Sequence, residues 1–336
     1  MDLLNALVAL LNYVLIPATS YAAQLSLGAL GVTLIYGILR FSNFAHGDTM
    51  AFGTSVTILC TWLLQSLGIS AGPLPTALIA LPFGIMATSG LLLATDRFVY
   101  RFQRKSKAPP VRLVIISMGV MFIFNGLTRF IIGVKDRSFA DGERFIISAA
   151  QFKAMTGLQE GLTLRTTTVI TVITAVLVVT ALFWFINKTW TGRSMRAFSD
   201  NEDLALLSGV DPERVVKITW VIVAALATIA GVLYGLDKSF KPYTYFQLLL
   251  PIFAASVVGG LGNPLGAIGG GIVVAFSEVA LTYAWTKVAG YILPPAMVPE
   301  GLLQLVAIEY KFAISFIILV SVLLFKPTGL FSGKSL

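Results

Sequence analysis

The chain contains one long polar stretch between apolar segments, Thr191–Lys217, whose sequence is TGRSMRAFSDNEDLALLSGVDPERVVK. Its first half predicts two short helices. Asp200 or Asn201 can cap the second of them, because short polar side chains accept hydrogen bonds from the free N–H groups of a first helical turn. Glu202 and Asp203 come next, and carboxylates are favourable beside the positive end of the helix dipole.

The second half of the stretch predicts a helix end and a new helix start. Gly209 stands where chains commonly leave a helix in the left-handed conformation. Asp211 followed by Pro212 is typical of an N-cap and a first helical residue, so a further helix starts there and continues into the next apolar segment. A membrane protein that builds a capped helical elbow between two spans is expected to present it to a partner. We therefore predict that residues 191–217, called the elbow below, are a docking surface.

The composition excludes a soluble enzyme. Of the 336 residues, 57% are hydrophobic and 12% are charged, and the mean hydropathy is +0.86. Soluble domains carry about 25% charged residues, so we predict an all-α, polytopic bundle of membrane helices in a single domain spanning residues 1–336. The 24 Lys and Arg outnumber the 16 Asp and Glu, but they lie between the apolar segments, as the positive-inside rule requires. A nucleic-acid partner is therefore not expected.

The sequence contains no motif that is typical of a catalytic, metal-binding or phosphate-binding site. Cys60 and His46 are the sole cysteine and histidine, so a disulfide framework, a thiolate metal cluster, a zinc site and a catalytic triad are not expected. Phosphate-binding GxxxxGK[ST], HExxH and GxSxG motifs are missing from the sequence. If energy is consumed, we expect another subunit to consume it, and we predict no catalytic residue, metal or cofactor in this chain.

Apolar length predicts eight to ten membrane spans, because one span needs about 20 apolar residues. The last candidate is too long for one helix and holds Glu309 and Lys311 near its middle. The candidates are Leu3–Ala18, Ala22–Leu39, Met50–Leu67, Pro75–Ala94, Leu113–Gly133, Thr167–Ile186, Ile218–Leu236, Leu248–Val258, Gly266–Trp285 and Glu300–Phe325.

The polar connections set the expected orientation. Arg97–Arg112 holds six basic residues and is assigned to the cytoplasm. One span later, Val134–Thr166 is polar and mixed in charge, so we expect it outside. Another span returns the chain and puts the elbow in the cytoplasm, where we also expect the C-terminus.

Two interruptions of apolar runs are candidate parts of a transport path. Polar groups at membrane depth are tolerated when protein buries them or when they line a water-filled path. Paired broken helices, one in each half of a chain, are the usual sequence sign of such a site in a protein of two related halves. The alternative is that each interruption is a tight cytoplasmic turn between complete spans. The candidate residues are Asn43, Phe44, His46 and Asp48 in Arg40–Asp48, and Gly259, Gly260, Gly262 and Asn263 in Val258–Gly266.

Four stretches resemble the LivH-type permease subunits of ABC importers for branched-chain and other hydrophobic amino acids. They are Gly31–Gly53, Gly192–Asp237, Val257–Gly271 and Phe325–Phe331, and they follow the same order along the chain. The run NFAHG within the first stretch is the most specific. Residues 134–166 and 284–300 fit less well, which leaves the substrate and the choice of binding protein open.

The resemblance implies a set of partners in the inner membrane of a bacterium. A homologous second permease, two subunits that bind ATP and Mg, an extracytoplasmic substrate-binding protein and the lipid bilayer are expected. The elbow resembles the EAA loop of ABC permeases, with Asp203, Ala205 and Gly209 in its acidic, alanine and glycine positions, whereas Leu204 departs from the usual alanine. The expected coupling surface comprises Arg193, Arg196, Asp203, Ala205, Leu207 and Gly209.

The sequence thus predicts the permease subunit of an ATP-driven importer that moves branched-chain or other amino acids into the cytoplasm. Permeases of the same family serve urea and short amides, so these substrates remain open. A rival of another class is a secondary carrier that couples an ion to transport through His46 and Asp48. A further alternative is a structural subunit whose partner permease carries the whole pore.

Overall fold

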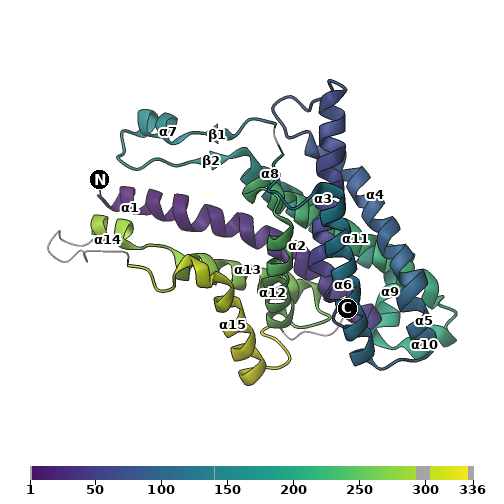
Figure 1. The fold of residues 1–336 in the computed structure, drawn as a ribbon. Helices are drawn as coiled ribbons and strands as arrows, with labels where there is room; N and C mark the ends of the chain where they lie inside the picture. The colour runs from purple at the N-terminus through teal and green to yellow at the C-terminus, as the bar shows by residue number, and fades with distance from the viewer. Residues whose placement is uncertain (1, 140, 293–302, 332–336) are drawn as a thin grey trace.

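The computed structural model describes residues 2–139, 141–292 and 303–331, and it is built almost entirely of helices (Figure 1). In the first half the elements are α1 (Asp2–Leu10), η1 (Leu11–Leu15), α2 (Ile16–Leu39), α3 (His46–Ser66), α4 (Ala77–Thr95), η2 (Asp96–Tyr100), α5 (Arg101–Lys105), α6 (Pro110–Ile132), β1 (Phe145–Ile147), α7 (Ala149–Thr156), β2 (Leu164–Arg165) and α8 (Thr166–Lys188). In the second half they are α9 (Trp190–Asp200), α10 (Glu202–Leu207), α11 (Pro212–Lys238), α12 (Pro242–Gly259), α13 (Pro264–Thr282), α14 (Thr286–Ile292), η4 (Ile308–Tyr310) and α15 (Lys311–Phe325).

Eight helices in the described part of the chain are long and apolar enough to cross a membrane. This number lies within the predicted range, but the first two candidates were wrongly separated. Leu3–Ala18 and Ala22–Leu39 belong to one helix of 38 residues, Asp2–Leu39, in which α1 and α2 are joined by the π-helical turn η1. A π-turn adds one residue to a helical turn, and the absent N–H of Pro17 directly after it is tolerated at the second position of α2.

Three further boundaries differ from the prediction. The basic connection at 97–112 is mostly helical, because η2 and α5 continue α4 as far as Lys105. The last apolar candidate is one helix, α15, that begins at Lys311, so Glu309 stands just before its first turn. Residues 300–302 of that candidate lie outside the described ranges. The α3 helix covers the third candidate and starts four residues earlier, at His46, but it is not among the eight helices that are long and apolar enough to cross a membrane.

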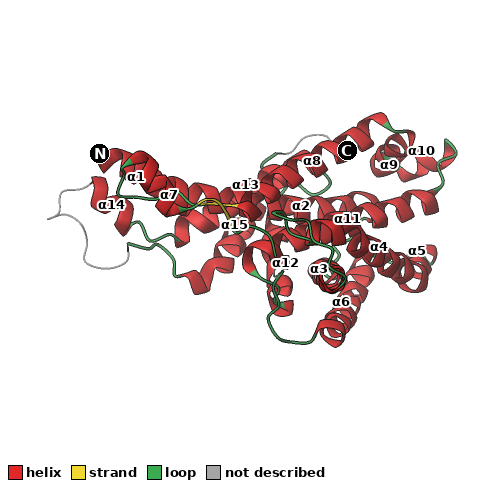
Figure 2. Ribbon diagram, turned by 90° about the horizontal axis from the view of Figure 1, so that it is seen from above, coloured by secondary structure: helices red, strands yellow, loops and turns green. Residues whose placement is uncertain are grey.

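Helix α2 forms the centre of the bundle. Figure 2 shows it surrounded by other helices, and nearly all of its side chains are buried. It packs against α8, α11, α12 and α13. In the absence of a hydrophobic driving force within lipid, such packing depends on small residues and on hydrogen bonds between helices. One of these bonds joins the hydroxyls of Thr33 and Ser256, 2.7 Å apart, between α2 and α12.

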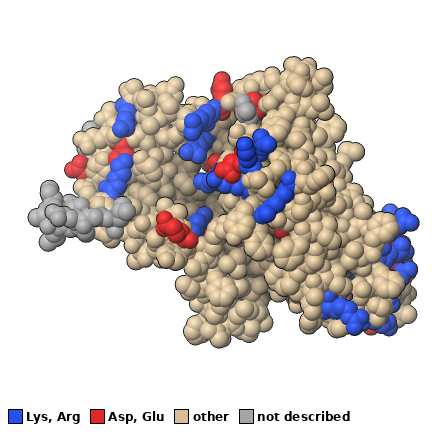
Figure 3. Space-filling view, in the orientation of Figure 1, with Lys and Arg blue, Asp and Glu red and all other residues tan. Residues whose placement is uncertain are grey.

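The two ends of the molecule differ in character. The elements α5, α9 and α10 gather at one end in Figure 1, while α1, α7, α14 and the β1–β2 hairpin gather at the other. Basic side chains crowd the end that holds α5 and α10 in Figure 3, which agrees with the cytoplasmic assignment of that end. The stretch 134–166 forms the hairpin and α7 at the opposite end.

Candidate coupling surface and transport groove

The elbow consists of the capped helices predicted from its sequence. Asn201 caps α10 by accepting a hydrogen bond from the N–H of Leu204 (3.1 Å), so of the two candidate caps it is Asn201 that serves. Asp211 caps α11 through the N–H of Glu213 (2.9 Å), with Pro212 as the first helical residue. Gly209 follows α10 with φ +80°, the left-handed conformation that glycine adopts without strain.

The predicted coupling residues divide into exposed and buried positions. Leu207 is 85% exposed, which is unusual for a leucine in a folded helix, and Arg193 and Asp203 are exposed too. Ala205 is buried, because it lies on the face of α10 that packs against the bundle. Arg196 turns back along the chain and lies 3.4 Å from the amide oxygen of Asn187. The elbow therefore offers an apolar and charged outer face on a capped, rigid base.

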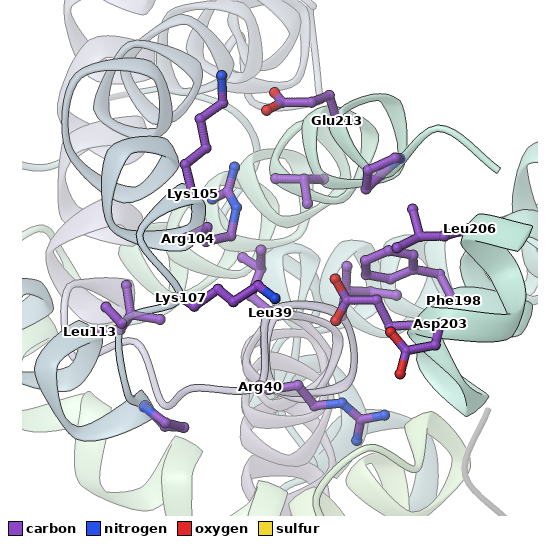
Figure 4. Close-up of a pocket in the computed structure, with 16 residues that line it drawn as sticks. Leu39, Arg40, Arg104, Lys105, Lys107, Leu113, Phe198, Asp203, Leu206 and Glu213 are labelled. Atoms are coloured by element: carbon purple, nitrogen blue, oxygen red, sulfur yellow. The ribbon is translucent and has the colours of Figure 1, made fainter. Parts of the chain in front are cut away.

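A cavity of about 540 Å³ opens beside the elbow (Figure 4). The two sides of this cavity carry opposite charge. Lys105 and Lys107 approach from the end of α5 and the turn after it, while Asp203 approaches from α10 and Glu213 from the first turn of α11. Arg101, in the same helix as Lys105, binds Glu213 at 2.9 Å and so ties α5 to the start of α11.

A buried carboxylate holds this end of the bundle together. Asp96, 3% exposed in the π-helical turn η2, accepts two hydrogen bonds from the guanidinium of Arg104, at 2.5 and 3.1 Å. The indole N–H of Trp220 also donates to Asp96, at 2.8 Å, from within α11. Charge-assisted, bidentate bonds of this kind are the strong ones in proteins. This cluster was not predicted from the sequence, although a lone Asp at the end of an apolar run was a usable signal.

The cluster continues to the first interrupted segment. Tyr100 stacks on Trp220 with ring centroids 5.4 Å apart, and its hydroxyl lies 3.4 Å from the amide oxygen of Asn43. That oxygen also accepts from the N–H of Ala45 (3.1 Å), just before α3 begins. Because Arg104 lines the cavity beside the elbow as well, a chain of buried contacts joins the elbow to residues 40–48.

The polar side chains of this segment are buried within the chain. Asn43, His46 and Asp48 are each 2% exposed or less, so they face neither lipid nor the cytoplasm, and in this conformation they are packed away from water as well. Asp48 accepts a hydrogen bond from the amide of Asn125 in α6 at 2.7 Å. The ring of His46 packs against Gly31, where a Cβ atom would lie 2.5 Å from a ring carbon.

Phe44 points the other way, into a wide apolar groove. The groove has a volume of about 910 Å³ and lies between α6, α12 and α15. The ring of Phe44 packs on Phe253 of α12, with centroids 5.2 Å apart. Ser42 and Gln247 are the polar residues among the lining side chains, and the others include Met118, Met121, Phe122, Leu249, Phe253, Phe312 and Leu319.

The second interrupted segment lies in a turn between α12 and α13. Asn263 caps α13 through the N–H of Gly266 (3.2 Å), and its side-chain amide donates to the carbonyl of Phe331 (2.8 Å). Residues 326–331 thus fold back on the turn, and the backbone N–H of Leu330 donates to the carbonyl of Val258 (2.8 Å). The groove reaches Val257, one residue before this segment, but Gly259, Gly260, Gly262 and Asn263 do not line it. The structure therefore does not bring the two interrupted segments together in one site.

These features define a multi-pass membrane protein with a structured elbow at one end and an apolar groove along its side. The family model described as "Branched-chain amino acid transport system / permease component" matches residues 14–323. The chain belongs to this family. It is therefore a transport component and not an enzyme, as the sequence analysis expected.

Curated relatives match over nearly their whole length. The high-affinity branched-chain amino acid transport system permease protein LivH of Escherichia coli K12 is 33% identical over 310 residues, which cover 90% of this chain and 89% of the relative. BraD of Pseudomonas aeruginosa, named as a permease of the same kind of system, is 26% identical over 319 residues, 94% of each chain. A probable LivH permease of Methanocaldococcus jannaschii is 29% identical over 317 residues, which cover 93% and 90%.

Proposed function

We propose that residues 1–336 form a single permease domain that imports branched-chain amino acids into the cytoplasm with energy from separate ATP-binding subunits. The observation that carries this proposal is the pairing of two surfaces in one chain. The elbow presents Leu207 and Asp203 to a partner, and the groove beside Phe44 presents an apolar lining to a passenger. Buried contacts through Asp96 and Tyr100 connect the two surfaces.

The lining of the groove favours aliphatic side chains over urea or short amides. Small polar solutes need hydrogen-bond partners to replace water, and the groove offers Ser42 and Gln247 among otherwise apolar residues. The aliphatic side chain of leucine, isoleucine or valine loses no hydrogen bonds there and gains burial, whereas the charged ammonium and carboxylate groups of the amino acid need partners outside this lining. The names of the relatives LivH and BraD, which specify branched-chain amino acids, support the same substrate class.

The groove also supports a second permease as a partner. A homologous chain that packs over the groove, in place of lipid, would close its apolar lining into a path between the two permeases. Two ATP-binding subunits would then dock on the two elbows. An extracytoplasmic binding protein would deliver the substrate to the end that holds the β1–β2 hairpin.

The ion-coupled carrier is less well supported by the same geometry. His46 and Asp48 are packed inside the chain, and Asp48 is engaged by Asn125. A coupling ion would need water access to these groups, which the conformation described here does not provide.

Purification of the tagged chain from native membranes tests the proposal. We expect an ATP-binding subunit and a second permease of the same family to remain bound, and we expect the complex to take up leucine in preference to urea. Isolation of the chain without any ATP-binding partner, together with leucine uptake in the absence of ATP, would show that the proposal is wrong.

A further inference from the structure

A second, charged cavity lies at the end of the molecule opposite the elbow. It has a volume of about 300 Å³, which is room for roughly ten water molecules or one small organic molecule. Its walls come from three places in the chain. They are residues 12–20 of the first long helix, Thr163 to Thr168 at the start of α8, and Asp237 with Lys238 at the end of α11.

Basic, acidic and apolar side chains all line this cavity. Arg165 and Lys238 are the cations and Asp237 is the anion. Ile16 and Pro17 supply the apolar wall. Figure 3 shows basic and acidic side chains gathered near the middle of the drawn face, well apart from the basic end that holds α5 and α10.

Asp237 forms two long salt bridges in this cavity. Arg165 lies 3.9 Å from Asp237, and Lys238 lies 3.5 Å from the other carboxylate oxygen. Direct charge-assisted hydrogen bonds are about 2.7–2.9 Å long. The same end of the molecule contains pairs of that length, such as Lys287 with Glu160 at 2.9 Å. Asp237 is nearly buried, with a side chain 9% exposed, so its carboxylate is largely desolvated, and the two salt bridges that neutralise it are both longer than a direct hydrogen bond.

We propose that this cavity is an entry subsite for the free amino acid, in which Asp237 binds the α-ammonium group and Arg165 with Lys238 binds the α-carboxylate. The apolar wall of Ile16 and Pro17 then faces the aliphatic side chain. This inference rests on the proposed function and adds to it a site outside the apolar groove, which has no charged residue in its lining. A zwitterion needs both charges at once, and the groove offers neither.

A second ion pair, between Lys311 of α15 and Glu278 of α13, lies beside Tyr21 of α2. Tyr21 follows the lining residue Ser20, and the ammonium of Lys311 lies 3.7 Å from the centre of its ring. Lys311 is also 3.4 Å from the carboxylate of Glu278, which is fully buried and accepts a hydrogen bond from Ser315. Lys311 interacts electrostatically with Asp237 and Lys238 as well. The subsite is thus the outer part of a charged zone that extends into the bundle, where an isolated charge would be costly.

Ligand competition on the complete transporter tests this subsite. The complex of this chain with its co-purifying subunits is placed in nanodiscs without binding protein or ATP, and bound radiolabelled leucine is displaced with three competitors. These are leucine, isovalerate, which lacks the ammonium group, and isopentylamine, which lacks the carboxylate. We expect leucine to compete at concentrations about tenfold lower than either analogue, since each charged contact contributes roughly a factor of ten or more.

Single variants test separately the proposed contacts to the ammonium group and to the carboxylate of leucine. Asp237→Asn should remove the advantage of leucine over isovalerate, and Arg165→Gln should remove its advantage over isopentylamine. Lys238→Gln should act in the same direction as Arg165→Gln and serves in its place if that variant does not assemble. Glu143→Gln and Lys153→Gln, which change exposed charges at the same end of the molecule, should leave both advantages intact.

Two results would overturn the subsite. One is equal competition by all three compounds in the unchanged complex, and the other is unchanged selectivity in the Asp237 and Arg165 variants. Either result leaves the proposed function standing if the complex still takes up leucine with ATP. Hydrolysis of ATP without any leucine uptake would instead contradict the proposed function itself.

Discussion

Replacement of Asp96 by alanine should destabilise the end of the bundle that carries the elbow. The change removes the acceptor of two bonds from Arg104 and of the indole N–H of Trp220, whose ring is fully buried. Breaking a buried ion pair by deleting one partner costs about 3–5 kcal/mol. The side chain of Arg104 is 21% exposed and can reach water in part, so we place the cost at the lower end, about 3 kcal/mol.

Two other variants provide reference values for the loss of stability expected in Asp96→Ala. Trp220→Phe removes one donor and keeps most of the ring packing, so we expect a loss of about 1 kcal/mol. Asp136→Ala breaks a pair with Lys241 that is equally close, at 2.7 Å, but both partners are more than half exposed, so the expected loss is below about 1 kcal/mol.

The assay is the thermal unfolding temperature of the purified complex in detergent, with ATP hydrolysis as a second measurement. The expected order of destabilisation is Asp96→Ala, then Trp220→Phe, then Asp136→Ala. If Asp96→Ala unfolds at the same temperature as Asp136→Ala, the carboxylate does not hold this end together, and the reasoning from its buried bonds is wrong.

Three further predictions concern the elbow, the groove and Glu160. Gly209→Val should lower transport at normal membrane abundance, because a β-branched residue at φ +80° is strained. Gly209→Asn should retain more activity, because asparagine adopts this conformation more readily. Equal transport by the two variants would contradict this prediction. With Cys60 replaced, a single cysteine at position 44 should react with a small thiol reagent, because Phe44 lines the groove. A single cysteine at position 43 should be protected, because Asn43 is buried. Equal labelling at both positions would refute the assignment of the groove. Burial raises the pKa of Glu160, but hydrogen bonds from Lys287 and Tyr291 more than offset this and leave the pKa below its usual value. Its contribution to stability is therefore present above the usual carboxyl pKa and is lost as the pH falls through the lowered value, so Glu160→Gln should unfold at a lower temperature than the unchanged chain at neutral pH and at the same temperature in strong acid.

Local signals in the sequence predicted the elbow closely. Caps and helix ends depend on the residue itself and its near neighbours, which is why Asn201, Gly209 and Asp211 take the expected places. Apolar length likewise predicted the membrane helices. Apolar length could not distinguish one long helix from two. The helix Asp2–Leu39 continues without a break, because its π-helical turn and its buried face accommodate the polar residues within it.

The site was harder to predict because burial depends on contacts between distant segments. Asn43, His46 and Asp48 are adjacent to Phe44 in sequence, yet they point into the bundle while Phe44 faces the groove. The pairing of Asp96 with Trp220 joins residues 124 positions apart, so the lone carboxylate at the end of an apolar run is visible in the sequence but its partner is not. The glycine-rich segment around Gly259 was predicted as part of a transport path, with a turn as the alternative, and nothing in it indicated that residues 326–331 fold over it.

Leucine uptake by the complete complex, in proteoliposomes with its binding protein, tests directly whether ATP drives transport. We predict uptake that requires ATP inside the vesicles and persists when ionophores collapse the proton and sodium gradients. Uptake that continues without ATP and stops with the ionophores would contradict the account and identify an ion-coupled carrier instead.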